Sequence, residues 1–426
     1  MRFVFVTDQL QEPGGAGHLA MNHALIVWLR DRGHEVRVLL LAARLPRLVQ
    51  YYAAAPVTGI GIRAWRGYVF PVAPRAIFGV LGRAALAKLP RPASAALKRL
   101  RRRQRYAGAD EVIGAPVTAT QRAWCAAAVA RLRPDAVIAD TVFRAPIFRA
   151  PIFRAPAMTE ETAETRRIII ASDVFHLRHR ALSGQGYRVF PLEMTPAMEA
   201  ELLNLADLIV AIHPRDAASF RVLCPDKTVC SAPMPALPCP RPPQLARIPG
   251  RLVFVGSTAL PNLDGLRWFF AEIWPLLKRL RPSVTLDLVG DCGPALGRVP
   301  EGVTVLGRVR ELSGILHRAA LAIAPLRIGS GLKIKILDYA RHGLLTVATA
   351  EAQRGFAADA TAPFIPAETA GEFATAIASA LAKADPADEE RTLRYVTKHY
   401  GVEASFAELA VALENISFNG NRLRRS

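Results

Sequence analysis

Residues 325–340 read PLRIGSGLKIKILDYA, and this stretch decides the fold of the chain. The apolar residues 320–324 before it predict a buried strand, and the apolar spacing at its end predicts a helix. Between them lies a short loop that contains Gly329, Ser330 and Gly331. A strand that enters a tight loop and then a helix leaves unpaired backbone N–H groups and the positive end of the helix dipole at the loop. The stretch therefore predicts an α/β fold with an anion site, and phosphate is the expected ligand.

Charged side chains flank this predicted anion site. Arg327, Lys333 and Lys335 supply positive charge. Asp338 follows Lys335 by three residues, so the two can share one face of the helix. A carboxylate just behind a phosphate site can bind two hydroxyls of a ribose. The alternative is that Lys335 and Asp338 form a surface ion pair and that the glycines only turn the chain.

Residues 252–349 resemble the nucleotide-sugar domain of glycosyltransferase family 4. Five landmarks follow the family's order: VFVGS at 253–257, PNLDGLRWFF at 261–270, LDLVGD at 286–291, VTVLGRV at 303–309, and the block at 325–340. The resemblance implies the GT-B fold, with two facing Rossmann-like domains and a C-terminal helix that crosses back to the N-terminal domain. It also implies a nucleotide-diphosphate sugar of the UDP or GDP type as donor, and transfer with retention of the anomeric configuration.

The same resemblance implies site residues, and the chain departs from the family at two places. The two glutamates that the family usually has in the block correspond to Ser330 and Asp338. The arginine and lysine that often follow the first strand of the domain correspond to Ser257 and, approximately, Asn262. The expected catalytic residues are Asp173, Arg327 and Lys335. The expected donor-binding residues are Gly15, Gly256, Ser257, Gly290, Arg308, Gly329, Ser330, Gly331, Leu332, Lys333 and Asp338.

The length of 426 residues suits two domains of roughly 200 residues each. Seven prolines within residues 233–249 are typical of a semi-rigid linker. The expected division is an acceptor-side domain at 1–232, the linker at 233–249, the nucleotide-sugar domain at 250–390 and a crossover helix at 391–426.

The net charge of +19 indicates anionic partners, and much of it comes from one segment. Residues 44–105 contain fourteen Arg and Lys and no Asp or Glu. Apolar residues alternate with these cations within 75–105, which favours docking on an anionic membrane surface. The alternatives are a core-packed helix with solvated arginines or a mobile loop. Nucleic acid is not an expected partner, because no recognition motif for it is present.

The first strand is followed by a loop with Gly14, Gly15 and Gly17, which reads G-G-x-G. It is not the full dinucleotide fingerprint, so NAD binding is not supported. By resemblance, this loop closes over the donor phosphates and the acceptor. His18, at the start of the next helix, is a candidate ligand contact on the acceptor side, and a solvated histidine at a helix end is the alternative.

A second candidate group follows the predicted strand at 168–171. The family commonly has a His-Asp pair there, and this chain has Ser172 and Asp173. Asp173 is expected at the carboxyl edge of the sheet, where open α/β folds bind ligands. His176 and Arg178 are close enough in sequence to contribute, with His176 on the acceptor side. The alternative for Asp173 is an ordinary cap for the following turn.

Residues 143–157 repeat the unit FRAPI. The period of five is too short for a solenoid, and the proline in each copy forbids a regular helix interior. The repeat therefore predicts an extended or irregular excursion on the surface.

Metal binding and membrane insertion are not expected. The five cysteines are scattered, with no C-x-x-C pair and no histidine at zinc-ligand spacing. There is no Asp-x-Asp motif to hold a metal on a diphosphate, and the donor is the only small molecule expected, without a cofactor. No apolar run approaches the roughly 18 residues that span a bilayer. The expected location is the cytoplasm, with peripheral attachment to the inner face of the membrane left open.

The predicted function is a retaining, metal-independent glycosyltransferase that moves a sugar to a glycan or lipid-linked acceptor in cell-surface polysaccharide or glycolipid synthesis. A catalytically weak binding or scaffolding subunit is one alternative, since serine stands at family-polar positions 172, 257 and 330. A nucleotide-sugar epimerase of the same shape is another. It would need acid and base carboxylates, and only Asp173 is found in place.

Overall fold

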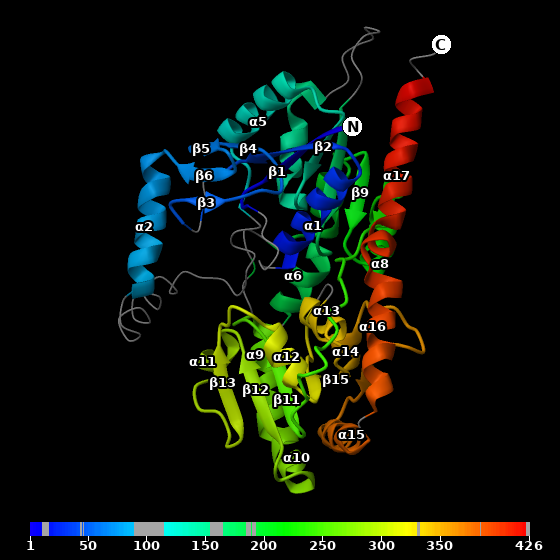
Figure 1. Ribbon diagram of the computed structural model, residues 1–426. Helices are drawn as coiled ribbons and strands as arrows, with labels where there is room; N and C mark the ends of the chain where they lie inside the picture. The colour runs from blue at the N-terminus through cyan, green and yellow to red at the C-terminus, as the bar shows by residue number, and fades with distance from the viewer. Residues whose placement is uncertain are drawn as a thin grey trace. The chain divides into compact units, whose positions relative to one another are not determined.

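The computed structural model (Figure 1) describes residues 1–10, 17–42, 45, 47–88, 115–153, 165–184, 189, 193–329, 333–383 and 385–422. The chain forms two compact units. Unit 1 consists of Met1–Pro233 with Ala407–Ser426, and unit 2 consists of Met234–Phe406. Each unit contains its own parallel β-sheet with helices on both faces, as the alternation of strand and helix patterns predicts.

Unit 1 contains a seven-stranded sheet in the order β10-β9-β8-β7-β1-β2-β4, with every strand pair parallel. Its strands are β1 (Arg2–Thr7), β2 (Glu35–Leu40), β4 (Val57–Gly59), β7 (Ala136–Ala139), β8 (Arg166–Ala171), β9 (Leu208–Ala211) and β10 (Thr228–Ser231). The central strands are apolar and fully buried, as expected when helices cover both faces. The strand order reverses between β1 and β7, which creates a switch point at the carboxyl edge.

Helices surround this sheet, and a small antiparallel sheet lies beside helix α2 (Pro74–Lys88). The small sheet has the order β3-β6-β5. Its strands are β3 (Gln50–Tyr51), β5 (Ile62–Trp65) and β6 (Tyr68–Pro71). The other helices of unit 1 are α1 (Gly17–Asp31), α5 (Ala119–Leu132), α6 (Phe175–Ser183), α7 (Pro196–Leu203), α8 (Pro214–Leu223) and α17 (Val402–Arg422).

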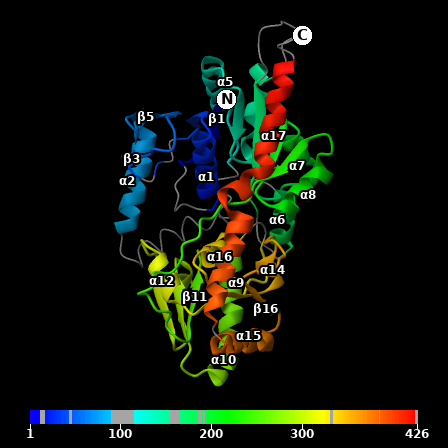
Figure 2. The ribbon, with the colours of Figure 1, turned by 45° about the vertical axis from the view of Figure 1, so that its right-hand side comes forward.

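Helix α17 returns to unit 1 from residue 407 onward. It runs beside α8 in both ribbon views (Figures 1 and 2), and Arg221 of α8 lies 3.7 Å from Glu408 of α17. The same oxygen of Glu408, Oε2, accepts a hydrogen bond from the backbone N–H of Ser231 at 2.8 Å. The expected α/β fold, with two Rossmann-like units and a final helix that crosses back to the first, is thereby confirmed.

Unit 2 contains a six-stranded parallel sheet in the order β13-β12-β11-β14-β15-β16. Its strands are β11 (Arg251–Val255), β12 (Thr285–Val289), β13 (Val303–Gly307), β14 (Leu321–Ala324), β15 (Thr346–Ala348) and β16 (Phe364–Pro366). The order reverses between β11 and β14, so the switch point of this unit lies at their carboxyl ends. The helices are α9 (Leu260–Trp268), α10 (Trp274–Leu280), α11 (Cys292–Leu296), α12 (Ser313–Arg318), α13 (Ile334–Arg341), α14 (Ala350–Gln353), α15 (Ala370–Ala382) and α16 (Pro386–Tyr400).

A π-helical turn, η3 (Phe269–Ile273), separates α9 from α10. The sequence predicts one helix around residues 263–280 that Pro275 kinks or divides, and the structure divides it there, with Pro275 in the first turn of α10. The helical spacing of Trp268, Phe269, Phe270 and Trp274 predicts core positions. Three of them are buried in the core of unit 2, and Phe270 is partly buried against it. A proline lacks an N–H for the helix ladder, and the wider π turn accommodates that loss.

The predicted surface position of the FRAPI repeat is wrong. The first two copies and Phe153 of the third contribute to the 3₁₀ turns η1 (Val142–Arg149) and η2 (Pro151–Phe153), and Phe143, Phe148 and Phe153 are buried in the core of unit 1. Proline rules out an α-helix interior, but short 3₁₀ turns tolerate it. Burial of each phenylalanine contributes roughly 1.5–3 kcal/mol, which favours packing over solvent exposure.

Candidate functional site

The candidate site lies at the carboxyl edge of the sheet in unit 2, around the switch point between β11 and β14. Gly256 and Ser257 directly follow β11, and the residues from Pro325 to Gly329 follow β14. Two neighbouring strands add Gly290 after β12 and Arg308 after β13. The fold thus brings the described donor-binding candidates to one edge, which is where open parallel sheets bind ligands.

Glycine is required where the loops after β11 and β12 meet. Gly290 has φ +95°, and a Cβ on it would lie 2.3 Å from the carbonyl oxygen of Gly256. A Cβ on Gly256 would lie 2.6 Å from the Phe254 ring. The two loops therefore pack backbone against backbone at Gly290, and a side chain there would separate them, whereas a side chain at Gly256 would collide with the Phe254 ring.

Lys335 is the buried cation of this edge. It stands in the first turn of α13, its Nζ donates a hydrogen bond to Oδ1 of Asn262, and Nζ lies 4.4 Å from the centroid of the Phe254 ring. Burial lowers its pKa from the usual range to about 7. Asn262 stands approximately where the family resemblance expects a lysine. In this chain the position carries an acceptor, and the cation comes from α13.

The other predicted cations already have carboxylate partners. Arg327 donates to both oxygens of Asp264 at 2.8 and 3.1 Å. Arg308 donates to Asp291 through Nε at 2.7 Å.

Lys333 completes this set, with Nζ 3.2 Å from Oε1 of Glu351 and both side chains nearly buried. Within the described part of the chain, Lys335 is the one cation of the four that lacks a carboxylate partner. Sequence reasoning missed the acidic partners at 264, 291 and 351, because they are distant in sequence.

Asp338 lies one helical turn after Lys335. Its carboxylate pairs with Arg341 at 3.2 Å, and burial raises its pKa. Tyr339, the next residue, fixes the helix: its hydroxyl accepts a hydrogen bond from the backbone N–H of Val255 at 2.7 Å. Helix α13 is therefore tied to the end of β11, beside the glycine loops.

In unit 1, Asp173 is only 5% exposed and accepts a hydrogen bond from Arg178 at 2.8 Å. It follows β8 at the carboxyl edge, as predicted. His176 does not join it, because His176 Nδ1 lies 2.7 Å from Glu199. The buried Glu199 carboxylate also accepts the backbone N–H groups of Phe175 and His176, so it caps α6, a role that the sequence did not reveal.

The glycine loop of unit 1 is described only at its end. Gly17 and His18 begin α1, and burial lowers the pKa of His18 to about 4, so its imidazole is neutral at physiological pH. Several predicted site residues lie outside the described residues. They are Gly14, Gly15, Ser330, Gly331 and Leu332.

A buried polar cluster that sequence reasoning missed lies at the switch point of unit 1. Thr7 donates to Asp140 at 2.6 Å, and Arg144 donates to Asp8 at 2.7 Å while its Nε lies 3.9 Å from Asp140. Burial raises the pKa of Asp140 to about 6. A signal was present in the sequence, because each aspartate follows closely after a buried strand, β1 or β7.

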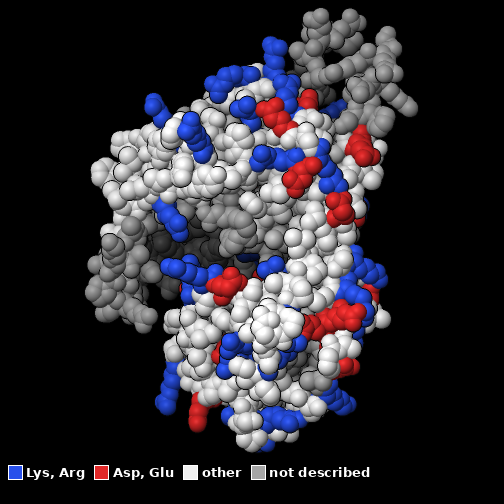
Figure 3. All heavy atoms as spheres, in the orientation of Figure 1, with Lys and Arg blue, Asp and Glu red and all other residues white. Residues whose placement is uncertain are grey.

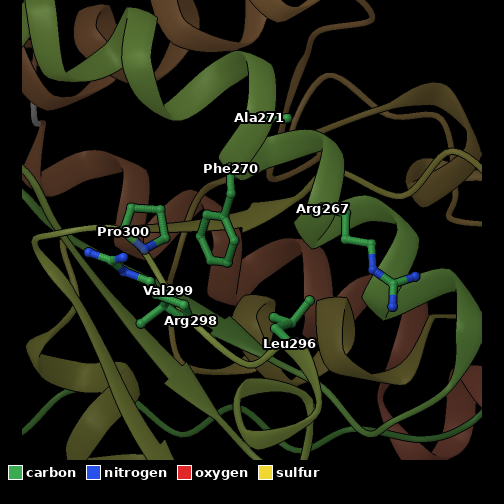
Figure 4. Close-up of a pocket in the computed structure, with 7 residues that line it drawn as sticks. All are labelled: Arg267, Phe270, Ala271, Leu296, Arg298, Val299 and Pro300. Carbon is green, nitrogen blue, oxygen red and sulfur yellow. The ribbon is translucent and has the colours of Figure 1, made fainter.

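One pocket of unit 2 lies away from the candidate donor site. It has a volume of about 440 Å³ and is drawn in Figure 4. Its lining residues are Arg267, Phe270, Ala271, Leu296, Arg298, Val299 and Pro300. The last three precede β13, so the pocket borders the amino end of that strand, whereas parallel sheets bind nucleotides at the carboxyl ends.

With this geometry in view, residues 249–383 match the family model described as glycosyl transferases group 1. Similar solved structures cover nearly the whole chain. Sucrose-phosphate synthase from Thermosynechococcus elongatus is 14% identical, with 98% of this chain and 99% of that chain covered and a TM-score of 0.61. The chain has the GT-B glycosyltransferase fold.

Two further structures were solved with ligands. Anabaena HepE in complex with UDP is 13% identical, with a TM-score of 0.60 and coverage of 97% of this chain and 100% of that chain. A variant of S. aureus TarM in complex with fondaparinux, alpha-GlcNAc-glycerol and UDP is 8% identical, with a TM-score of 0.60 and coverage of 96% and 99%. At these identities the likeness shows the fold alone.

A curated relative covers a shorter stretch. It is an uncharacterized 44.6 kDa protein in the cps region of Klebsiella pneumoniae, 25% identical over 116 residues. The match spans 24% of this chain and 30% of that protein.

Proposed function

We propose that this protein is a retaining glycosyltransferase of family 4 that takes a sugar from a nucleotide-diphosphate sugar. The observation that carries the proposal is Lys335, a cation buried at the switch point without a carboxylate partner among the described residues. An unneutralised cation at this edge of the sheet is suited to an anionic ligand. The bound UDP of HepE and of TarM supports UDP as the first nucleotide to test.

In the proposed reaction, bond cleavage places negative charge on the departing diphosphate. Lys335 stabilises that charge together with the backbone N–H groups of residues 329–332, of which 330–332 lie outside the described residues. Arg327 exchanges its Asp264 partner for a phosphate oxygen, and Asp338 binds the ribose hydroxyls. These cations take the place of a divalent metal. The proposed acceptor-side groups, Asp173 among them, position the acceptor hydroxyl and exclude water.

The deciding experiment measures binding of UDP, GDP, ADP and UMP by calorimetry to the native protein, to Lys335→Met and to Arg279→Gln. Arg279 is an exposed cation near the end of α10, which leads to the amino end of β12, so it is a matched control. We expect one diphosphate to bind, with affinity lost in Lys335→Met and kept in Arg279→Gln. Equal affinity in all three proteins contradicts the proposal.

Turnover distinguishes the proposed enzyme from its alternatives. Transfer that persists in a chelator supports metal independence. Donor binding without turnover indicates a scaffolding subunit, and an epimerised donor formed without acceptor indicates an epimerase. Replacement of Arg327 or Lys335 by Ala is expected to lower kcat more than it raises KM for the donor, because both act mainly on charge that develops in the transition state.

We further propose a glycan or lipid-linked acceptor reached at an anionic membrane, which places the enzyme in cell-surface polysaccharide or glycolipid synthesis. In the described part of 75–105, helix α2 exposes Phe78 (72%) and Leu81 (45%). Residues 89–105 lie outside the described residues. Elsewhere on the visible face, Lys and Arg alternate with acidic side chains and form no single patch (Figure 3).

The hairpin of β5 and β6, which contacts helix α2, adds exposed aromatic side chains to the proposed membrane-docking surface. Arg66 and Gly67, with φ 48° and 84°, form the two-residue turn between β5 and β6. Trp65 and Tyr68 flank the turn and are 64% and 47% exposed, and the Arg66 guanidinium lies 5.1 Å from the Trp65 ring. Aromatic side chains beside cations are typical of the membrane interface. No helix in the described ranges is long and apolar enough to span a membrane.

Sedimentation with vesicles tests this docking. The native chain is compared with Trp65→Ser/Phe78→Ser, with a variant carrying Gln at 99, 101, 102 and 103, and with Val222→Ser, an exposed apolar residue of α8, as control. We expect binding to anionic vesicles at low salt that both test variants lose and the control retains. Native protein that stays in the supernatant contradicts the docking while leaving the transferase proposal intact.

A further inference from the structure

A thiol and two imidazoles converge in unit 2, away from the donor-site candidates. Cys239 lies in the proline-rich segment, His317 in α12, and His342 directly after α13. One ligand atom of each, Sγ and a ring nitrogen of each histidine, lies within 4.8 Å of the other two. The histidines are 4% and 0% exposed, respectively. The three residues are far apart in sequence, which is why their spacing did not predict a metal site.

Backbone carbonyls set the tautomers of both rings. Nε2 of His317 lies 2.9 Å from the carbonyl oxygen of Cys239, and Nδ1 of His342 lies 2.7 Å from the carbonyl oxygen of Asp338. A carbonyl only accepts, so each of these nitrogens carries the proton in a neutral ring. Each ring therefore retains one nitrogen with a lone pair. An N–H bonded to a carbonyl is the usual support of a metal-ligating histidine.

We propose that Cys239, His317 and His342 bind a structural Zn²⁺ ion. Thiolate and imidazole are the preferred ligands of zinc, which binds them at about 2.3 and 2.0–2.1 Å in tetrahedral geometry. A tetrahedral site of this size requires the three ligand atoms to move closer together by roughly an ångström. The fourth position is suited to water or to the hydroxyl of Ser313. In the metal-free protein this hydroxyl donates a hydrogen bond to Nε2 of His342 at 3.0 Å, and the ion would take its place on that lone pair.

The ion would join three segments at the C-terminal end of α13. The backbone N–H of Cys239 already donates to the carbonyl oxygen of Arg341 at 2.6 Å, and the centroids of the His317 and His342 rings lie 5.0 Å apart with the rings tilted by 60°. The site stabilises the helix whose other end carries Lys335. It is a structural site and does not act on the diphosphate, so it is independent of the proposed function.

The test uses tag-free full-length protein freed of metal with a chelator and then titrated with Zn²⁺ or with Co²⁺, whose spectrum reports its ligands. The variants are Cys239→Ser, His317→Gln and His342→Gln. Matched controls are Cys224→Ala, a buried thiol of unit 1, and His399→Gln, a half-buried histidine of unit 2. Melting temperature is measured with and without Zn²⁺.

We expect one equivalent of Co²⁺ to give tetrahedral d–d bands and a thiolate-to-cobalt charge-transfer band that Cys239→Ser abolishes. Zn²⁺ should raise the melting temperature of the native protein and both controls. Each ligand variant should lose the rise and bind at least about tenfold more weakly. Absence of the charge-transfer band from the native protein titrated with Co²⁺ overturns the proposal. This result does not depend on whether the variants fold. A rise that persists in all variants also overturns it, since the ion then binds elsewhere.

Discussion

The hydroxyl of Tyr339 accepts the backbone N–H of Val255 at 2.7 Å and so joins helix α13 to the last residue of strand β11. Both residues flank the switch point of unit 2. The bond positions the helix that carries Lys335 and Asp338 against the glycine loops. Burial also raises the pKa of Tyr339 beyond its usual range, so the hydroxyl stays protonated.

Tyr339→Phe should reduce both stability and donor binding. The substitution leaves a buried N–H without an acceptor, which costs about 1–3 kcal/mol of unfolding free energy. Urea denaturation and UDP calorimetry measure the two effects. Tyr400→Phe is the matched control, because the Tyr400 hydroxyl accepts the N–H of Ala357 elsewhere in unit 2. If both variants bind UDP equally well, the bond is structural only.

Lys335 should make UDP binding pH-dependent. Its pKa is about 7 in the free protein, so the side chain is mostly neutral at pH 8. A bound diphosphate favours the charged form, so binding at pH 8 should take up a proton and affinity should fall as pH rises above 7. Calorimetry in two buffers of different ionisation enthalpy measures the uptake. The prediction fails if Lys335→Met takes up as many protons as the native chain.

The Lys335 side chain should also make the free energy of unfolding depend on pH. An unfolded lysine has a pKa of about 10.4, so between pH 7 and that value the unfolded chain holds more protons than the folded one. Stability attributable to Lys335 therefore rises with pH across this window. Lys335→Met should be more stable than the native chain near pH 7, with the difference shrinking toward pH 10. A pH-independent difference in urea midpoint contradicts this.

Asp338→Ala should weaken donor binding by about 1.5–3 kcal/mol, since a charge-assisted hydrogen bond to the ribose is lost. The chain offers a close control in Asp388→Ala. Asp388 pairs with Arg391 three residues later, as Asp338 pairs with Arg341, but it lies on α16. Calorimetry should show lost affinity in the first variant only. Unchanged affinity in folded Asp338→Ala would remove the ribose assignment.

Two copies of one repeat give a paired stability test. Arg144 and Arg149 occupy the same position of FRAPI, but Arg144 is 2% exposed beside Asp8, whereas Arg149 pairs with Glu201 on the surface. Arg144→Met removes the cation beside the buried carboxylates of Asp8 and Asp140 and should lower the unfolding free energy by about 3–5 kcal/mol. Arg149→Met should change it by less than about 1 kcal/mol. Similar urea midpoints for the two variants would show that burial of the arginine does not determine how much stability its replacement costs.

The sequence predicted those features that depend on residues close together in the chain. Apolar runs predicted most strands of both sheets but not the short edge strands β4 and β16, and Pro275 predicted a kink or break between α9 and α10. The features it missed depend on contacts between distant positions. Arg144 and Asp8 are 136 residues apart, and Lys335 and Asn262 are 73 apart. The repeat was assigned to the surface because a proline in each copy excludes a regular helix interior. In the structure, 3₁₀ turns accommodate the prolines, and Asp8 at the end of β1 allows Arg144 to be buried.

The π turn between α9 and α10 affects how the chain tolerates a change in length. A π turn holds one residue more than an α turn, so it is equivalent to a single insertion in an otherwise continuous helix. Deletion of one residue from Phe269–Ile273 would convert the π turn to an α turn, and Trp268 and Trp274 would keep their present orientations toward the core. Pro275 would have to be replaced by a residue with an N–H. Unit 2 can therefore be shortened here without shifting the register of its core, a change that a regular helix would not absorb.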